Sequence, residues 1–453
     1  MKTIRKAQLG SVVLVALCLT MVLGIAVIGY VAVCARTMQM SNRSFCSINS
    51  GQLAEIGLEE SLWSLNQALQ AFNNNSFYGW PGWTLATVSG VPTATRQLTG
   101  FTTNRGIAGV VNLQIANYNP QTYNAADPTT FPVITSDGIS QMSDGIPIDR
   151  RLQVRVKPAA LFSNAVGAYS SCSFTINWDC PLNSYLSTSD PDASSPSDKA
   201  IVSAPSVSVN AANVFGYVAT TGTAPTYTLG GTVTRADTPG GVSRDPRYIF
   251  TNASQNLFDI LSDANLPGNY AGDPNAHING PAIGTAGAAV PSRYVASSLS
   301  LSGSQTLTVD GPVIIAISGN FSIADTAKIT ITANGSLQIV VSGSISIRGH
   351  GINNALTKRP KNLAVISRSS GSYASINNYT AQLNTADRFD GIIYVPYGSL
   401  QVYGTTAVYG SLVANVVDQG FGNGVVHYDL NLRNAVFSTL NTPYEVAQWL
   451  VSN

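Results

Sequence analysis

The feature that most constrains this chain is an uncharged apolar run at residues 11–35, which follows the basic residues Lys2, Arg5 and Lys6. As a helix rising ~1.5 Å per residue, the run is roughly 37 Å long, more than the ~30 Å hydrocarbon core of a bilayer. A secretory signal peptide has an apolar region of only about 7–15 residues. The run therefore predicts a membrane-spanning helix and not a plain secretory signal.

The same helix is predicted to continue beyond the apolar run. Apolar residues over 48–69 recur mostly at spacings of three and four, while Glu55 and Glu59 occupy other faces. This pattern indicates an amphipathic helix. Asn, Gly and Pro interrupt it in the segment NNNSFYGWPGW at 73–83. One helix is thus expected over 11–75, which by hydropathy alone also fits any signal anchor followed by a stalk helix.

This N-terminus resembles that of type IV pilins, most closely the PilX-like minor pilins. Gly10 followed by Ser11 matches the prepilin peptidase site of that family, and GQLAEIGLEESLWSLNQAL at 51–69 matches the second half of its first helix. The resemblance covers roughly residues 1–70 and implies cleavage between Gly10 and Ser11, so that 1–10 is a leader. It also implies methylation of the new N-terminus, an inner-membrane stage, and partners among pilin subunits, the prepilin peptidase and the assembly machinery.

The chain departs from the major pilins at the fifth mature position, where Val15 replaces their glutamate. In that family the glutamate offsets the positive N-terminus of an adjoining subunit, a buried charge that is otherwise costly. A subunit at the filament tip has no subunit above it, and therefore no neighbouring positive N-terminus that a glutamate would need to neutralise. The departure therefore implies a minor or initiating subunit.

Strand patterns fill the rest of the chain. The segments GIAGVVNLQIANYN at 106–119 and RRLQVRVKP at 150–158 alternate apolar and polar residues, which predicts a small pilin-like β region over 76–157. After residue 158, short alternating strands end in Gly, Asn or Ser. This sequence pattern favours a β-solenoid, in which each turn of the chain places a strand on the strand of the previous turn. An antiparallel β-sandwich is the alternative.

The same region resembles a C-terminal domain of unknown activity that is often fused to PilX-like N-termini. Residues 298–348 and the segment FDGIIYVPYGSLQVYGTTAVYGSLVAN at 389–415 carry this resemblance. It extends over about 160–432, and the interval 235–292 departs from it.

The predicted fold class is α+β, with a long N-terminal pilin-like helix, a small β region and a large C-terminal β-solenoid. The solenoid is divided into 158–240 and 293–453 by a loop-rich insertion at 241–292. Within the insertion, a short helix is expected near Gln255–Ala264. The segment TPYEVAQWLVSN at 442–453 is expected to form a terminal helix that caps the last turn.

Composition limits the functions that are open to the chain. Only 10% of the residues are charged, against ~25% in a typical globular domain. The net charge is +1 and no basic patch or charged tail is present, so binding to nucleic acid is not predicted. Cys172 and Cys180 form a close pair, which predicts a disulfide if this part is exported and free thiols if it is cytosolic.

Metal and cofactor binding have little support. His277, His350 and His427 are the only histidines, and they lie far apart in the sequence. Three acidic residues of STSDPDASSPSDKA offer oxygen ligands to Ca²⁺: Asp190, Asp192 and Asp198. The segment lacks the Gly and bidentate Glu of a defined calcium loop, so a solvated loop is favoured. No metal and no cofactor is predicted.

Catalysis has no better support. No G-x-S-x-G motif occurs. A β-helix polysaccharide enzyme needs paired carboxylates, whereas Asp310 and Asp325 lie in different predicted turns. Six aromatic residues are candidates for stacking on sugars: Trp80, Trp83, Tyr394, Tyr397, Tyr403 and Tyr409. Packing between turns is the favoured role for them.

The sequence therefore predicts a non-enzymatic minor pilin-like subunit of a type IV pilus, at the tip or in assembly initiation, that displays a β-solenoid. The predicted location is the inner membrane before assembly and a filament or the cell surface afterwards. Three alternatives remain: a surface adhesin with a glycan or surface ligand, a type II secretion pseudopilin, and an anchored β-helix enzyme acting on carbohydrate.

Overall fold

A computed structural model of the chain describes residues 4–73, 82–103, 106–118, 128–141, 146–159, 161–174, 181–252, 278–288, 291–354, 356–369, 381–385, 388–404, 406–419, 424–435, 437 and 444–450. Two compact units can be distinguished. The helix–sheet unit comprises 1–65, 79–157 and 446–453, and the large unit comprises 66–78 and 158–445.

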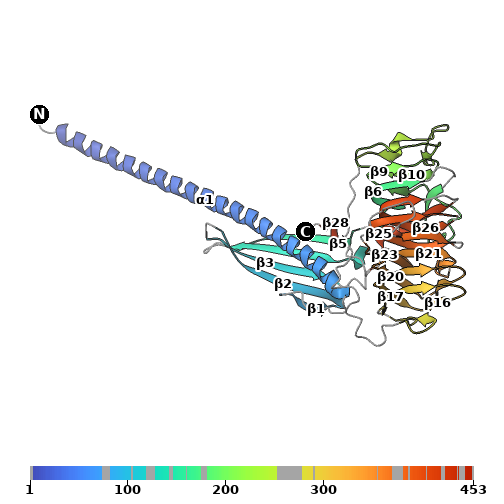
Figure 1. Cartoon of the computed structure of the whole chain (residues 1–453). Helices are drawn as coiled ribbons and strands as arrows, with labels where there is room; N and C mark the ends of the chain where they lie inside the picture. Colours follow the sequence, from blue (N-terminus) through green and yellow to red (C-terminus); the bar gives the residue numbers. More distant parts are fainter. Residues whose placement is uncertain are drawn as a thin grey trace. The chain divides into compact units, whose positions relative to one another are not determined.

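The helix–sheet unit consists of one long helix and a six-stranded sheet (Figure 1). Helix α1 (Ile4–Asn73) is continuous and includes nearly all of the predicted 11–75 span. The strand order is β1-β2-β3-β4-β5-β28, and β1 to β5 pair with one another antiparallel. The bounds are β1 (Thr84–Val88), β2 (Val91–Thr102), β3 (Ala108–Ala116), β4 (Val133–Gln141), β5 (Ile148–Pro158) and β28 (Tyr444–Leu450). A 3₁₀ turn, η2 (Pro128–Thr130), precedes β4.

The core of this unit lies between the second half of α1 and the sheet. Leu53 is buried in one cluster with Val111 and Leu113 of β3. Residues of β3 and β4 alternate between buried and less buried positions, as expected for strands with one face against a helix. Ile48 and Ile56 belong to the same apolar sequence pattern as Leu53, but they are exposed.

Two glycines allow α1 to approach the sheet closely. A Cβ atom on Gly138 of β4 would lie 2.1 Å from the carbonyl oxygen of Ser50 and 2.6 Å from the amide nitrogen of Ala54. A Cβ atom on Gly57 of α1 would lie 2.2 Å from Oγ of Ser136. The contacts of Gly138 are with backbone atoms of α1, so this packing requires glycine there, whereas a Cβ atom at position 57 would meet side-chain atoms that can move.

The C-terminal segment corrects one prediction. Tyr444–Leu450 is a strand, β28, and not the predicted helix over the last turn of the large unit. It lies next to β5 in the sheet of the helix–sheet unit. Without β28, β5 would be an edge strand with unpaired backbone groups, and a terminal strand satisfies them. A side-chain contact joins the two strands as well, since Nη1 of Arg155 on β5 donates to Oε1 of Gln448 on β28 at 3.4 Å.

The large unit consists of short strands that pair in parallel. Their bounds are β6 (Val166–Phe174), β7 (Pro181–Tyr185), β8 (Ala200–Ser203), β9 (Ser206–Ser208), β10 (Asn213–Ala219), β11 (Thr232–Thr234), β12 (Ile249–Phe250), β13 (Ala282–Ile283), β14 (Ser292–Ala296), β15 (Leu299–Leu301), β16 (Thr306–Val309), β17 (Pro312–Ile317), β18 (Phe321–Ile323), β19 (Lys328–Ile331), β20 (Ser336–Val341), β21 (Ile345–Gly349), β22 (Gly351–Asn353), β23 (Leu363–Ser367), β24 (Ala381–Thr385), β25 (Phe389–Val402), β26 (Ala407–Gln419) and β27 (Val425–Asp429). The described part of this unit also contains the 3₁₀ turns η3 (Pro246–Tyr248), η6 (Pro360–Asn362) and, after β27, η7 (Leu430–Asn434).

Successive turns of the large unit stack in register. Ile315 of β17 pairs with Ile339 of β20, which pairs with Val365 of β23, which pairs with Ile393 of β25. All four side chains are at most 1% exposed, so equivalent positions form a column of aliphatic side chains through the core. Among the described strands of this unit every strand-to-strand pairing is parallel, so the antiparallel sandwich is excluded there.

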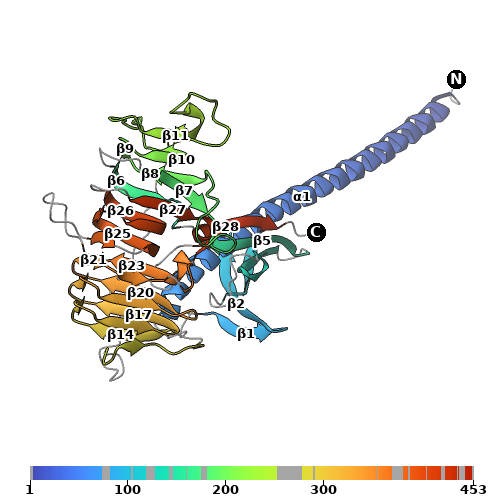
Figure 2. The ribbon, with the colours of Figure 1, turned by 90° about the vertical axis from the view of Figure 1, so that its right-hand side faces the viewer.

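The order of stacking differs from the order of the sequence. β26 pairs with β25 on one side and with β6 on the other, and β27 pairs with β7. Figure 2 shows β10 and β6 beyond β26 at one end of the stack, and β17 and β14 toward the other end. The described strands of 166–250 and of 292–429 therefore form one continuous stack that is joined at β26 and β6.

The predicted insertion at 241–292 contains η3, β12 and β13 and reaches the start of β14. The short helix expected at Gln255–Ala264 lies outside the described residues.

Candidate functional site

The first half of α1 carries a long exposed apolar surface. Leu14, Met21 and Ile28 are 67%, 70% and 71% exposed, and other apolar side chains from Val12 to Val33 are similar. This part of the helix is long and apolar enough to cross a membrane, and none of it is buried within the chain itself. Since exposed apolar surface costs about 25 cal/mol per Å², lipid or an apolar partner must cover it.

The predicted processing site lies within the bounds of this helix. The side chains of Gly10 and Ser11 are outside the described part of the chain, so cleavage between them stays a prediction. Val15 is 56% exposed, among side chains that are also apolar. Residues 12–35 contain no acidic residue, so this surface carries no carboxylate.

The large unit contains a buried ion pair. Asp390 of β25 is 0% exposed, and Nε of Arg388 donates to its Oδ2 at 2.6 Å, with a second contact from Nη2 to Oδ1. Nη1 of Arg388 also donates to Oδ1 of Asp192 at 2.8 Å, and Nζ of Lys358 donates to the same atom at 2.6 Å. Burial raises the pKa of Asp390, and the hydrogen bonds and charge of Arg388 oppose this rise.

Asp390 begins a polar column that crosses four strands. It pairs in register with Tyr409 of β26, which pairs with His427 of β27, which pairs with Asn183 of β7. The guanidinium of Arg388 lies 3.7 Å from the centre of the Tyr409 ring. The rings of Tyr409 and His427 are 4.6 Å apart, and Nδ1 of His427 lies 2.5 Å from Oδ1 of Asn183. The column thus spans the junction between β26–β27 and β6–β7.

We expect acid to destabilise the large unit through His427. Burial lowers the pKa of this imidazole to about 4, and the nearby charge of Arg388 acts in the same direction. Because the unfolded chain protonates its histidine near pH 6.5, stability is lost as the pH falls from about 6.5 to about 4, by up to about 3 kcal/mol. His427→Gln should flatten this dependence, measured by denaturant unfolding at pH 7 and pH 4.5. An equal loss in both proteins would contradict the assignment to His427.

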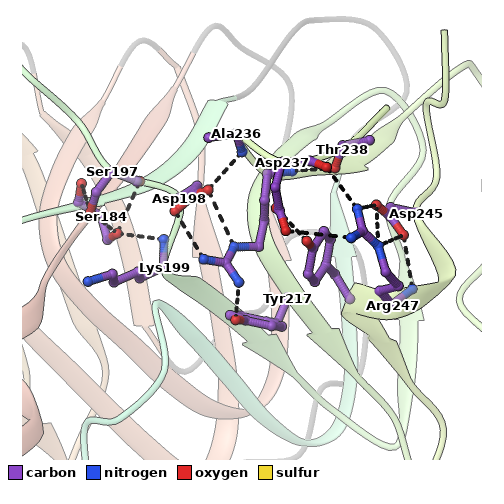
Figure 3. Close-up of polar contacts among 12 residues, drawn as sticks. Ser184, Ser197, Asp198, Lys199, Tyr217, Ala236, Asp237, Thr238, Asp245 and Arg247 are labelled. Carbon is purple, nitrogen blue, oxygen red and sulfur yellow. Dashed lines mark hydrogen bonds and ion pairs between the residues drawn. The ribbon is translucent and has the colours of Figure 1, made fainter. Parts of the chain in front are cut away.

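A second polar cluster is formed by Asp198, which precedes β8, by Tyr217 of β10 and by the segment after β11 (Figure 3). Arg235 forms an ion pair with Asp198, with 3.3 Å between Nε and Oδ2, and it also donates to the hydroxyl of Tyr217. The amide of Ala236 donates to Oδ2 of Asp198 at 2.8 Å. Burial acts to raise the pKa of Asp198, but the Ala236 amide and Arg235 outweigh it, so the pKa is lowered.

The same cluster continues to η3. Nη2 of Arg247 donates to Oδ2 of Asp245 at 2.7 Å, and this bonding lowers the pKa of Asp245 to about 2. The hydroxyl of Tyr248 donates to Asp237. The backbone is joined as well, since the amide of Asp245 donates to the carbonyl of Val233 at 3.0 Å. Together these contacts fix the segment 235–248 along β11 at the end of the stack.

The three acidic residues that were considered for calcium do not come together. Asp190 accepts from the amides of Ser194 and Ser195 at 3.0 and 2.7 Å and closes its own turn. Asp192 pairs with Lys358 and Arg388, and Asp198 pairs with Arg235. Within the described residues no three His, Cys, Asp or Glu side chains gather in a way that could hold a metal ion.

Among the described residues, the remaining histidine and aspartate candidates do not form a site with one another. His277 lies outside the described residues, and His350 lies in the turn between β21 and β22. Asp310 accepts from Oγ1 of Thr332 at 2.8 Å, and Asp325 accepts from the amide of Gly303 at 3.0 Å. Both carboxylates bind to neighbouring turns, and they are not paired with each other.

The aromatic candidates differ in burial. Trp80 lies outside the described residues, whereas Trp83 packs beside Leu53 and donates from Nε1 to Oγ of Ser64 at 3.1 Å. Tyr394 is fully buried against Phe162. The other three tyrosines differ in exposure, with Tyr397 exposed and the remaining two half-buried: Tyr403 and Tyr409.

Of the two cysteines predicted to form a disulfide, the structure describes one. Cys172 is buried on β6 at 1% exposure, and Cys180 lies outside the described residues. The disulfide between them stays a prediction.

Three features of the large unit were missed by sequence reasoning: the Arg388–Asp390 pair, the column through His427, and the aromatic residues of β10. Two of them carry a local signal. Arg388 and Asp390 are two residues apart, as are Phe215 and Tyr217 of β10, and such residues share one face of a strand.

Part of the chain matches a known protein family. A family model described as a domain of unknown function (DUF7305) matches residues 275–435, which is less than half of the chain. No curated protein matches the chain. The crystal structure of the competence-associated pilin ComZ from Thermus thermophilus is similar at 12% sequence identity and a TM-score of 0.30, covering 90% of this chain and 97% of that one. At this TM-score the likeness does not establish a common fold.

Proposed function

We propose that this chain is a minor, PilX-like pilin subunit of a type IV pilus or of the related type II secretion pseudopilus. The observation that supports this proposal is α1, whose first half exposes apolar side chains while its second half is packed on an antiparallel sheet. In the inner membrane, lipid covers the exposed half. After assembly, helices of neighbouring subunits cover it, so the same surface is satisfied in both states.

In this proposal the large unit is a β-solenoid that the filament displays, and the parallel stacking of its turns supports that class. Its role is structural and non-enzymatic. The partners are other pilin subunits, the assembly machinery and the prepilin peptidase. A surface adhesin anchored by the same helix is the second candidate, and the exposed aromatic residues of β10 and β12 favour it.

Gly10→Val is expected to block removal of residues 1–10, because the peptidase of this family requires a small residue at that position. Mass spectrometry of the N-terminal peptide measures the outcome. Gly29→Val is the matched control, since its position has open space and lies far from the predicted cleavage site. A mature wild-type protein beginning at Met1 or near Ala35 would refute the pilin proposal.

The subunit is expected at low copy number at the filament tip. Val15 offers no carboxylate to a subunit above, and the large unit, 158–445, would crowd a repeated helical shaft. Quantitative mass spectrometry of sheared filaments measures the ratio to the major subunit. Val15→Glu should leave incorporation nearly unchanged. A ratio near that of the major subunit would eliminate the tip position and leave the pilin proposal standing.

A further inference from the structure

Three aromatic residues lie together on the outside of the large unit. Phe215 and Tyr217 alternate with the buried Val214, Gly216 and Val218 on β10, so they share its outer face. Phe250 of β12 stacks on Tyr217, with ring centres 5.9 Å apart and 30° between the ring planes. Phe215 is 39% exposed and Phe250 is 49% exposed. We call Phe215, Tyr217 and Phe250 the aromatic strip.

Two of the three rings of the aromatic strip, those of Tyr217 and Phe250, are held by contacts with their neighbours. Tyr217 receives a hydrogen bond from Arg235, whose guanidinium carbon lies 4.9 Å from the centre of the Tyr217 ring. Tyr248 meets Tyr217 edge to face at 5.5 Å. Tyr217 thus supports the ring of Phe250, and Phe250 and Phe215 present the accessible rings. A ligand that stacks on a supported ring such as Phe250 loses little binding energy to ordering it.

The charges beside the aromatic strip are already paired. Asp198 pairs with Arg235, and Arg247 pairs with Asp245 and Asp237 (Figure 3). A surface whose carboxylates and guanidiniums neutralise one another does not attract a strongly charged ligand. The side chains of Arg247 and Asp237 are still 52% and 61% exposed, so they can hydrogen-bond to uncharged hydroxyl groups.

The exposed area excludes a stable protein interface at the strip alone. Aromatic side chains bury about 150–250 Å² each, and here two rings are less than half exposed, which leaves roughly 200 Å². A stable protein partner needs about 800 Å² on each side. A ligand of one or two rings matches the strip. The C–H face of a pyranose covers an aromatic ring, and its hydroxyl groups then project to the polar groups at the edge.

We propose that the aromatic strip binds neutral pyranose units of a glycan. Phe250 and Phe215 stack on the sugar rings, and Arg247 and Asp237 hydrogen-bond to their hydroxyl groups. This activity goes beyond the filament role proposed above and does not depend on it, because every residue concerned lies in the large unit.

The test uses the full chain in a sugar-free amine-oxide detergent, because maltoside detergents would occupy the strip. Titration calorimetry with maltohexaose, cellohexaose and chitohexaose is expected to detect binding of at least one of them. The double variant Phe215→Ala/Phe250→Ala should weaken that binding by at least roughly 10-fold. Tyr397→Ala, which removes another exposed aromatic ring of the large unit, should bind like the wild type.

Hydrogen exchange of β10 peptides verifies that the double variant is folded. Binding of none of the three neutral probes by the wild type, or equal binding by the folded double variant, would overturn the proposal. Binding of hexagalacturonate alone would also overturn it, since the strip would then serve an anionic ligand. Self-association in sedimentation that the double variant abolishes would assign the strip to a second copy of the chain. None of these results would affect the filament role.

Discussion

Gly138→Ala is expected to open the helix–sheet unit. The added methyl group would lie 2.1 Å from the carbonyl oxygen of Ser50 and 2.6 Å from the amide nitrogen of Ala54, and both are backbone atoms of α1. Backbone cannot rotate away as a side chain can, so the helix itself must shift. Overpacking costs about 1–3 kcal/mol and occasionally more, and a clash with backbone atoms places this variant toward the upper end. Hydrogen exchange of peptides from β4 and from residues 48–66 of α1 measures the loss.

Gly51→Ala makes the same chemical change on α1 itself, next to Ser50. A Cβ atom on Gly51 meets nothing within 4 Å, so this variant should gain up to about 1 kcal/mol from better helix propensity. Peptides of the large unit should keep wild-type protection in both variants. Equal protection of β4 in the two variants would show that the close packing of α1 on Gly138 is wrong.

Arg388→Met is expected to destabilise the large unit by about 3–5 kcal/mol, because it leaves a buried carboxylate without its cation. Asp390 is 0% exposed, and Arg388 donates two hydrogen bonds to it. Methionine keeps the length of the apolar stem, so most of the loss comes from the missing charge. The pKa of Asp390 should rise further in this variant. Because protonation then relieves the buried charge, the loss relative to wild type should shrink as the pH falls.

The double variant Arg388→Met/Asp390→Leu is the control. Replacing both partners of a buried pair by apolar residues is often close to neutral, so this protein should recover most of the lost stability. Denaturant unfolding at pH 7 for the wild type, the single variant and the double variant measures the coupling. A double variant as unstable as Arg388→Met would show that the pair serves packing and not charge compensation.

The long helix could be predicted from sequence because its signal is local and strong. The run at 11–35 has no charge, and the segment at 73–83 breaks the period close to Asn73, where α1 ends. The small sheet was similarly visible in the alternation of β3 and β5. These elements depend on neighbouring residues, and neighbouring residues are what a pattern reports.

The pairing partners could not be predicted, because generic apolar residues do not specify which strand they contact. Val166 and Leu412 are ordinary core residues, and nothing in their surroundings indicates that they pair. The conformation of the segment at 444–450 could not be predicted from its own residues either. Whether it becomes a helix or a strand depends on the open edge of β5, which is a property of the tertiary structure.

The candidate site in the large unit was predictable only in part. The outward alternation of Phe215 and Tyr217 could be read from NVFGYVA, but the stacking of Phe250 on Tyr217 requires β10 and β12 to be neighbours. The same holds for the column of Asp390, Tyr409 and His427, which exists only because three turns are in register.

The joining of β26 to β6 has a consequence for biogenesis. Oγ of Ser411 donates to the carbonyl oxygen of Asn164 at 2.6 Å, across 247 positions of the chain. Residues 158–252 leave the ribosome long before β26 exists, so their β6–β7 edge stays unpaired during synthesis and is open to wrong partners. Contacts this distant in sequence also slow folding. The large unit can therefore complete its folding only after β26 and β27 have been synthesised and can pair with β6 and β7. A chain truncated before β26 would keep this strand edge unpaired and prone to aggregation.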